Sequence, residues 1–175
     1  MATNLPEVWL RGPIEGVPPL LQPVAHALLE AVEEVKRIMQ DFPDELLWKR
    51  PADVASAGFH LQHVTGVLDR LSTYALSNNL LSEEQMNYLI AEGKETAVTT
   101  EELVSRFEQK VTQLVQQLRD SDESALTDHR SVGRKALPST VLGLLFHAAE
   151  HTMRHVGQLL VTVKVVRSSE EYQGT

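Results

Sequence analysis

The chain has 175 residues, of which 42% are apolar and 23% charged, and it carries a formal net charge of −8. This length and composition favour a single globular domain over residues 1–175 and exclude a mostly disordered chain. The absence of cysteine excludes disulfides, thiolate zinc sites and a cysteine nucleophile. The acidic balance argues against a nucleic-acid partner, and no apolar stretch is long enough to span a membrane. We therefore expect a cytoplasmic protein without a signal peptide.

Four segments show the periodicity of amphipathic helices. Apolar residues recur at steps of three and four from Leu21 to Ile38, and again from Leu61 to Ala75. The third segment runs from Leu103 to Leu118, and Thr100 is its expected N-cap. The fourth runs from about Ser139 to Val165 and is apolar around much of its circumference, which is typical of a buried helix.

The segments between and beyond these helices differ in character. Residues 1–19 are rich in proline and predict an extended N-terminal segment, whereas residues 167–175 predict a polar tail. The link 80–99 is long, and Ser82 within it looks like the N-cap of a short extra helix. A link of this length lets the second and third helices run parallel. The other long connection, 121–137, contains turn-forming residues.

No segment shows a strand pattern that competes with these helices. Four amphipathic helices of about 20 residues, with no sheet, should bury their apolar stripes against one another. The sequence therefore predicts an all-α fold, a four-helix bundle with a short extra helix in the connection between helices two and three.

Histidines are frequent, and five of the seven lie on two of the expected helices. His147, His151 and His155 follow one another at i, i+4 steps on the fourth helix, so they point roughly the same way. Two imidazoles at this spacing can hold one metal ion, but a third ligand must come from elsewhere, and His60 and His63 are the candidates on the second helix. Hydrogen-bonded core histidines remain the alternative, because a buried imidazole costs free energy unless it finds a partner.

A second motif overlaps the fourth-helix histidines. His147, Glu150 and His151 form the pattern H-x-x-E-H, the inverted signature of some zinc proteases. Those enzymes need a further carboxylate ligand well downstream, and only 24 residues follow His151. Glu150 is better interpreted as a solvated carboxylate or as one lying behind the ligands. The chain has no G-x-S-x-G motif and no glycine-rich phosphate loop.

Two segments resemble the DinB superfamily. Residues 145–158, LFHAAEHTMRHVGQ, are similar to that family's final-helix signature, in which H-x-x-x-H is followed closely by Gly-Gln. Residues 58–70, GFHLQHVTGVLDR, are similar to its second-helix segment, which carries one histidine ligand. Residues 9–13 and 18–23 also resemble a subgroup of the family. The resemblance covers nearly the whole chain, and the two histidine segments are its specific part.

The resemblance implies an up-down-down-up four-helix bundle, usually a homodimer, with three histidines around one divalent ion, often nickel or zinc. By position, the metal ligands would be His63, His151 and His155, and His60 and His147 would lie near the site. The helical geometry places His60 nearer the centre of the apolar stripe than His63, so whether His60 replaces or assists His63 stays open. Gln158 lies on the same face as His151 and is placed to hydrogen-bond a ligand or an imidazole.

Three neutral imidazoles leave a metal ion with an open position for water or substrate. The resemblance then implies a metal-dependent enzyme of the thiol-transferase or isomerase type that acts on a small molecule. Because the chain lacks cysteine, the thiol would come from a low-molecular-weight cosubstrate. The alternatives are a metal-dependent hydrolase, a non-catalytic metal-binding bundle of the stress response, and a bundle whose histidines bind nothing.

Overall fold

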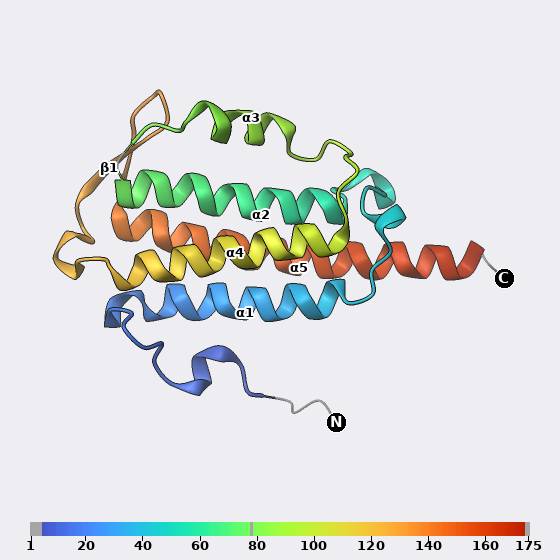
Figure 1. Cartoon of the computed structure of the whole chain (residues 1–175), viewed down its shortest axis with the longest axis horizontal. Coiled ribbons are helices and arrows are strands. Elements are labelled where there is room, and N and C mark those ends of the chain that lie inside the picture. Colours follow the sequence, from blue (N-terminus) through green and yellow to red (C-terminus); the bar gives the residue numbers. More distant parts are fainter. Residues whose placement is uncertain (1–4, 78, 174–175) are drawn as a thin grey trace.

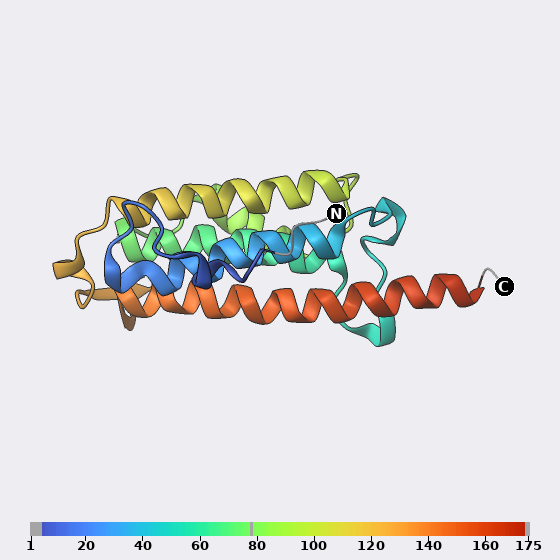
Figure 2. The same ribbon diagram turned by 90° about the horizontal axis from the view of Figure 1, so that it is seen from below.

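The computed structural model describes residues 5–77 and 79–173. Four long helices dominate it and lie side by side in Figures 1 and 2. α1 and α5 run in one direction in Figure 1, while α2 and α4 run in the other. Each of α1 and α2 packs against both α4 and α5. The bounds of the long helices are α1 Gln22–Met39, α2 Ala57–Ser72, α4 Thr100–Arg119 and α5 Val141–Gln173.

The apolar stripes predicted from the sequence form the core of the bundle. Buried apolar side chains from all four helices make one cluster, and burying them supplies the main driving force for folding. Every residue of the α1 and α4 stripes is buried, and on α2 only Leu71 is half-exposed. The least exposed large side chains include Leu28, Leu61, Phe107, Leu145 and Leu159. The expected all-α fold is confirmed.

Side-chain caps fix where three helices begin. The Ser56 hydroxyl accepts a hydrogen bond from the Phe59 N–H at the start of α2. Ser82 forms a capping box with Gln85, and this short helix, α3, spans Glu83–Ala91 as predicted. Thr99, not Thr100, is the N-cap of α4, where it forms a capping box with Glu102. The prediction for Thr100 was wrong by one residue: its N–H donates to Asp44 instead, at 2.6 Å.

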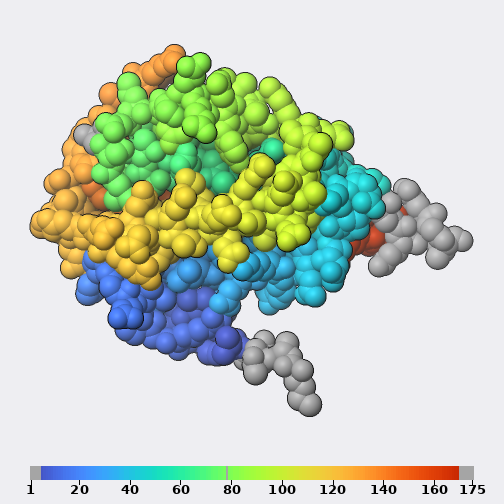
Figure 3. Space-filling view, viewed as in Figure 1, coloured from blue at the N-terminus to red at the C-terminus, as the bar shows by residue number. Residues whose placement is uncertain are grey.

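The N-terminal segment lies against α1 and forms the dark blue layer in Figure 3. Its Arg11 forms a two-point ion pair with Glu33 of α1, at 2.5 and 2.8 Å. Short turns of helix lie before and between the longer elements. They are η1 Val8–Arg11, η2 Pro19–Leu21, η3 Asp44–Leu46, η4 Pro51–Asp53, the π-helical η5 Thr73–Ser77 and η6 Glu123–Ala125.

One short hairpin contradicts the expectation of a chain without sheet. β1 His129–Val132 pairs antiparallel with β2 Leu137–Thr140 inside the connection from α4 to α5. The Arg130 side chain ties this hairpin to η5, which follows α2, through a 2.8 Å hydrogen bond to the Ala75 carbonyl. The hairpin lies at one end of the bundle (Figure 1), and its partly buried Val132 packs against the core.

α5 is longer than the sequence predicts, because it continues through the polar stretch to Gln173 and projects beyond the other helices (Figure 2). Arg167, in this extension, donates to the Gln40 carbonyl at 2.6 Å and so ties α5 to the end of α1. Among the described residues, no helix combines the length and apolarity needed to cross a membrane.

Candidate metal centre

Four histidines from α2 and α5 meet between the two helices. His63 Nε2 lies 3.0 Å from His151 Nε2, and the His155 ring centroid lies 4.5 Å from that of His63 and 4.6 Å from that of His151. One nitrogen from each of these three residues lies within 4.8 Å of the other two. The structure thus brings together the three histidines that the family resemblance implies as ligands, and we call them the triad.

Local structure on both helices places the triad. Because the Ser56 cap starts α2 at Ala57, His60 and His63 fall in its first two turns, facing α5. His151 and His155 lie one turn apart on α5, and α2 and α5 are closely packed along this stretch. The Phe59 ring stacks on the His63 imidazole and covers one of its faces, with the ring centroids 5.1 Å apart and the ring planes inclined by 12°.

A buried carboxylate orients His63. Glu92 Oε2 lies 2.8 Å from His63 Nδ1, while its Oε1 accepts a 2.5 Å hydrogen bond from Arg70. The Glu92 and Arg70 side chains are only 6% and 11% exposed. A neutral His63 that donates its Nδ1 proton to Glu92 keeps a lone pair on Nε2, directed at the other imidazoles. This carboxylate–histidine pair is the usual partner arrangement behind a metal-ligating histidine.

Sequence reasoning missed Glu92, which lies in the loop after α3. The backbone turns sharply there: Gly93 adopts φ +77° and donates its N–H to the Gln62 side chain of α2 at 2.8 Å. Gly66 makes room on α2, because a Cβ at that position would collide with Glu92 and lie 2.7 Å from an Arg70 nitrogen. The loop is therefore held against α2 with the carboxylate facing His63.

His60 lies behind His155 and is not a member of the triad. Its Nδ1 is 3.1 Å from His155 Nδ1, and the residue is only 4% exposed. When His155 donates this bond, its Nε2 keeps a lone pair for the triad. In this arrangement His60 is a partner that orients His155, and His63 is the residue of α2 that offers a nitrogen within 4.8 Å of nitrogens of both His151 and His155.

The remaining predicted residues lie at the edge of the group. His147 Nδ1 is 2.6 Å from Glu150, and both side chains are about half-exposed, at 50% and 40%. Arg154 contacts His151 Nδ1 from the solvent side. Gln158 is exposed on α5, and the structure does not bring it into the group.

Burial keeps His60, His151 and His155 neutral at pH 7. Burial, reinforced by His63, lowers the pKa of His60 to about 4. Burial and then the Arg154 charge lower the pKa of His151 to about 4, and burial with the neighbouring imidazoles lowers the pKa of His155 to about 3. Neutral imidazole is the form that binds metal, so the donor set fits a divalent cation such as zinc or nickel.

These lowered pKa values predict that the metal-free protein loses stability on mild acidification. Between pH 6.5 and about 4, the unfolded chain binds protons at these histidines while the folded chain does not, so the free energy of unfolding falls as pH falls. Melting temperatures measured in chelator from pH 7.5 to 5 should decline. A His60→Leu, His155→Leu variant should decline less, and an equal decline would contradict the prediction.

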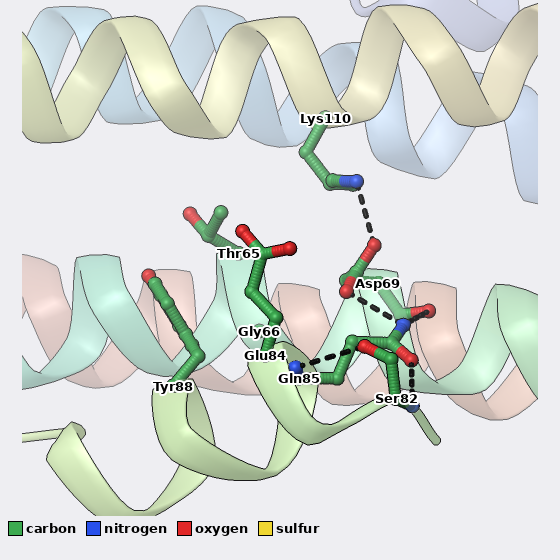
Figure 4. A pocket seen from close by; sticks show the side chains of 8 residues that line it. All are labelled: Thr65, Gly66, Asp69, Ser82, Glu84, Gln85, Tyr88 and Lys110. Carbon is green, nitrogen blue, oxygen red and sulfur yellow. Dashed lines mark hydrogen bonds and ion pairs between the residues drawn. The ribbon is translucent and has the colours of Figure 1, made fainter. Parts of the chain in front are cut away.

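A separate pocket lies near these elements. It has a volume of about 400 Å³ and lies between α2, α3 and α4, away from all histidines of the triad. In Figure 4 its polar side chains are bonded mainly to one another: Asp69 accepts from Lys110 at 2.7 Å and from Gln85 at 2.8 Å. These bonds join α3 to the bundle.

Comparison with known proteins agrees with this architecture. The sequence profile of the DinB superfamily matches residues 25–159, which include the triad, Glu92 and most of the four helices. Among curated proteins, none matches the chain.

Solved structures with the same fold share little sequence with the chain. A DinB-like protein from Bacillus cereus is 14% identical, with a TM-score of 0.58 over 77% of this chain and 84% of its own. A conserved protein from Enterococcus faecalis is 17% identical, with a TM-score of 0.67 over 85% and 97%. A protein from Streptococcus pneumoniae is 12% identical, with a TM-score of 0.62 over 83% and 88%. The fold and the match to most of the sequence lead to one conclusion: the chain belongs to the DinB superfamily.

Proposed function

We propose that the chain binds one divalent transition-metal ion, nickel or zinc, through His63, His151 and His155, and that it is a metal-dependent enzyme acting on a small molecule. The observation that carries the proposal is the convergence of one nitrogen from each of three imidazoles within 4.8 Å. Two of the three are backed by a hydrogen-bonding partner on their other nitrogen, Glu92 for His63 and His60 for His155. Such partners fix the ring and raise its basicity toward a metal.

The number of ligands favours catalysis over a purely structural role. Three protein ligands leave a coordination position open, whereas structural zinc sites are closed by four. An ion bound there would act as a Lewis acid and lower the pKa of a bound water or thiol. The chain's own residues position that chemistry: Glu92 and His60 orient two ligands, and Phe59 covers the face of His63.

We propose a thiol-dependent transferase or isomerase as the reaction type. The chain has no cysteine, so a thiol nucleophile would be a low-molecular-weight cosubstrate that fills the open position. The test is to load the protein with Ni²⁺ or Zn²⁺, confirm about one ion per chain by elemental analysis, and screen thiols with electrophilic small molecules. Turnover that needs both metal and thiol supports the proposal. Turnover of esters or amides without thiol would favour the hydrolase, and metal binding without any turnover would favour a non-catalytic bundle.

Glu92→Gln should weaken metal binding, and it should also lower the stability of the protein because Arg70 stays buried without its anion. The amide keeps an oxygen near His63 Nδ1 but removes the charge that makes this imidazole a better ligand. Loss of such a partner lowers metal affinity by about 10- to 100-fold. Competition with a chelator of known affinity measures the change, and Glu95→Gln, an exposed carboxylate in the same loop, is the matched control. Equal affinities of the two variants would contradict the orienting role of Glu92.

We also propose that the chain forms a homodimer. In support, α5 exposes large apolar side chains along one face, including Phe146 at 62% and Val161 at 61% exposure. Gly157, on the same face, has open space where a Cβ would lie, so a second helix can approach closely. Apolar patches of this kind often mark protein interfaces. Sedimentation equilibrium should give twice the chain mass, and Phe146→Asp should shift it to the monomer; a monomeric wild type would overturn the proposal.

A further inference from the structure

A second group of potential ligands lies on the solvent side of the triad. His147, Glu150 and His151 each offer one ligand atom, and these atoms lie within 4.8 Å of one another. The i, i+3 and i, i+4 spacing places all three on one face of α5, and His147 and Glu150 are about half-exposed. These three residues are the H-x-x-E-H motif of the sequence, of which only His151 belongs to the triad. The group combines two imidazoles with a carboxylate, a donor set suited to zinc and other divalent cations.

The two groups share His151, and the chemistry of imidazole determines how they relate. A neutral imidazole has one lone pair and therefore binds one metal ion at a time. His151 Nε2 faces His63 at 3.0 Å, whereas Nδ1 faces Arg154 on the solvent side. An ion held by the outer group through His151 and an ion held by the triad are therefore alternatives. The chain should hold one ion at equilibrium, and the outer group can be occupied only in transit.

Charge also favours a first contact at the outer group. Two carboxylates contact a histidine of the site within the part of the chain that the structure describes. Glu92 is buried and already neutralised by Arg70, whereas Glu150 faces solvent and contacts only His147. Arg154 contacts His151 Nδ1, so its side chain must move before that nitrogen can bind a cation in the outer group. Glu150 is therefore the negative charge that attracts a cation to the solvent side of the site.

From this geometry we propose that His147, Glu150 and His151 form an outer capture site that takes up a divalent metal ion and passes it, through His151, to the triad. The proposal rests on the metal-binding function proposed above. The ion first displaces Arg154 from His151 Nδ1 and is held there by the imidazoles and the Glu150 carboxylate. It passes to the triad when His151 releases its Nε2 proton to solvent and takes up a proton at Nδ1, so that its lone pair then faces His63. Release follows the same route in reverse.

The test is the rate of Zn²⁺ uptake and release in His147→Ala, Glu150→Gln protein. Stopped-flow mixing with a zinc-responsive dye gives both rates, and chelator competition gives the dissociation constant. Because a capture site changes the path and not the end state, both rates should fall by the same factor, about tenfold, with the dissociation constant unchanged. His129→Ala, Glu101→Gln removes an exposed imidazole and an exposed carboxylate elsewhere and should behave as the wild type.

The possible results separate this proposal from the one it rests on. Wild-type rates in the His147→Ala, Glu150→Gln protein would overturn the capture site and leave metal binding by the triad intact. A weakened affinity with an unchanged association rate would also overturn it, because His147 or Glu150 would then be a ligand of the final site. A wild type that takes up no ion would overturn the triad as a metal site, and the capture site with it.

Discussion

His155→Ala protein should no longer hold a divalent ion tightly, and neither should the His63→Ala or His151→Ala variant. Each change leaves two imidazoles at a site whose three nitrogens converge within 4.8 Å. The loss of affinity should exceed the roughly 100-fold that removal of an outer partner can cause. Elemental analysis after dialysis, together with chelator competition, measures the effect.

His60→Ala provides the graded comparison. His60 contacts the far nitrogen of His155, so its removal should weaken binding by about 10- to 100-fold without abolishing it. His129→Ala, which removes an exposed imidazole on β1, should leave affinity unchanged. If His60→Ala abolished binding while His63→Ala kept it, the ligand from α2 would be His60, and the arrangement proposed for the triad would be wrong.

The helical scaffold could be predicted because its signals are local in the sequence. Apolar residues at steps of three and four identify the buried face of each helix, and Ser82 with Gln85 marks the start of α3. The two ends that were misjudged have simple explanations. Thr99 and Thr100 are chemically equivalent caps, and the one three residues before Glu102 completes the capping box. α5 continues past Arg167 because no proline or glycine follows until position 174.

The hairpin escaped prediction because its strands have four residues each and lack a buried face. None of the eight strand residues is buried, so the alternation of apolar and polar residues that marks a strand is absent. Its stability comes from tertiary contacts such as the bond from Arg130 to Ala75. The pattern of residues within the segment does not predict those contacts.

The histidines of the triad could be located from the sequence, whereas the carboxylate that supports His63 could not. Helical spacing alone places His151 and His155 on one face of α5, and the resemblance to a known family selects His63. Glu92 lies 29 residues from His63 in a loop, where no periodic pattern relates the two. Only the packing of α3 against α2 brings the carboxylate to the imidazole. The sequence could therefore indicate the histidines of the triad and His60 beside them, but not Glu92, which contacts His63.

Arg70→Met should destabilise the protein by about 3–5 kcal/mol, because it leaves the Glu92 carboxylate buried without its cation. Glu92 is 6% exposed and Arg70 11%, so water cannot replace the guanidinium. The remaining partner of Glu92 is His63, and a proton drawn onto that imidazole would compete with the metal. The variant should therefore lose metal affinity as well as stability. Urea denaturation in the presence of chelator measures the free energy of unfolding of the metal-free protein, separately from metal binding.

A matched surface pair and a double variant test this account. Arg37 is 74% exposed and 3.7 Å from Glu34, so Arg37→Met should cost less than about 1 kcal/mol. Arg70→Met, Glu92→Leu removes both buried charges, and it should be more stable than Arg70→Met alone, because the stranded carboxylate is the main source of the loss. If Arg70→Met and Arg37→Met had the same urea midpoint, the ion pair behind His63 would not be a buried, coupled unit. The orientation of His63 would then have to depend on its stacking with Phe59.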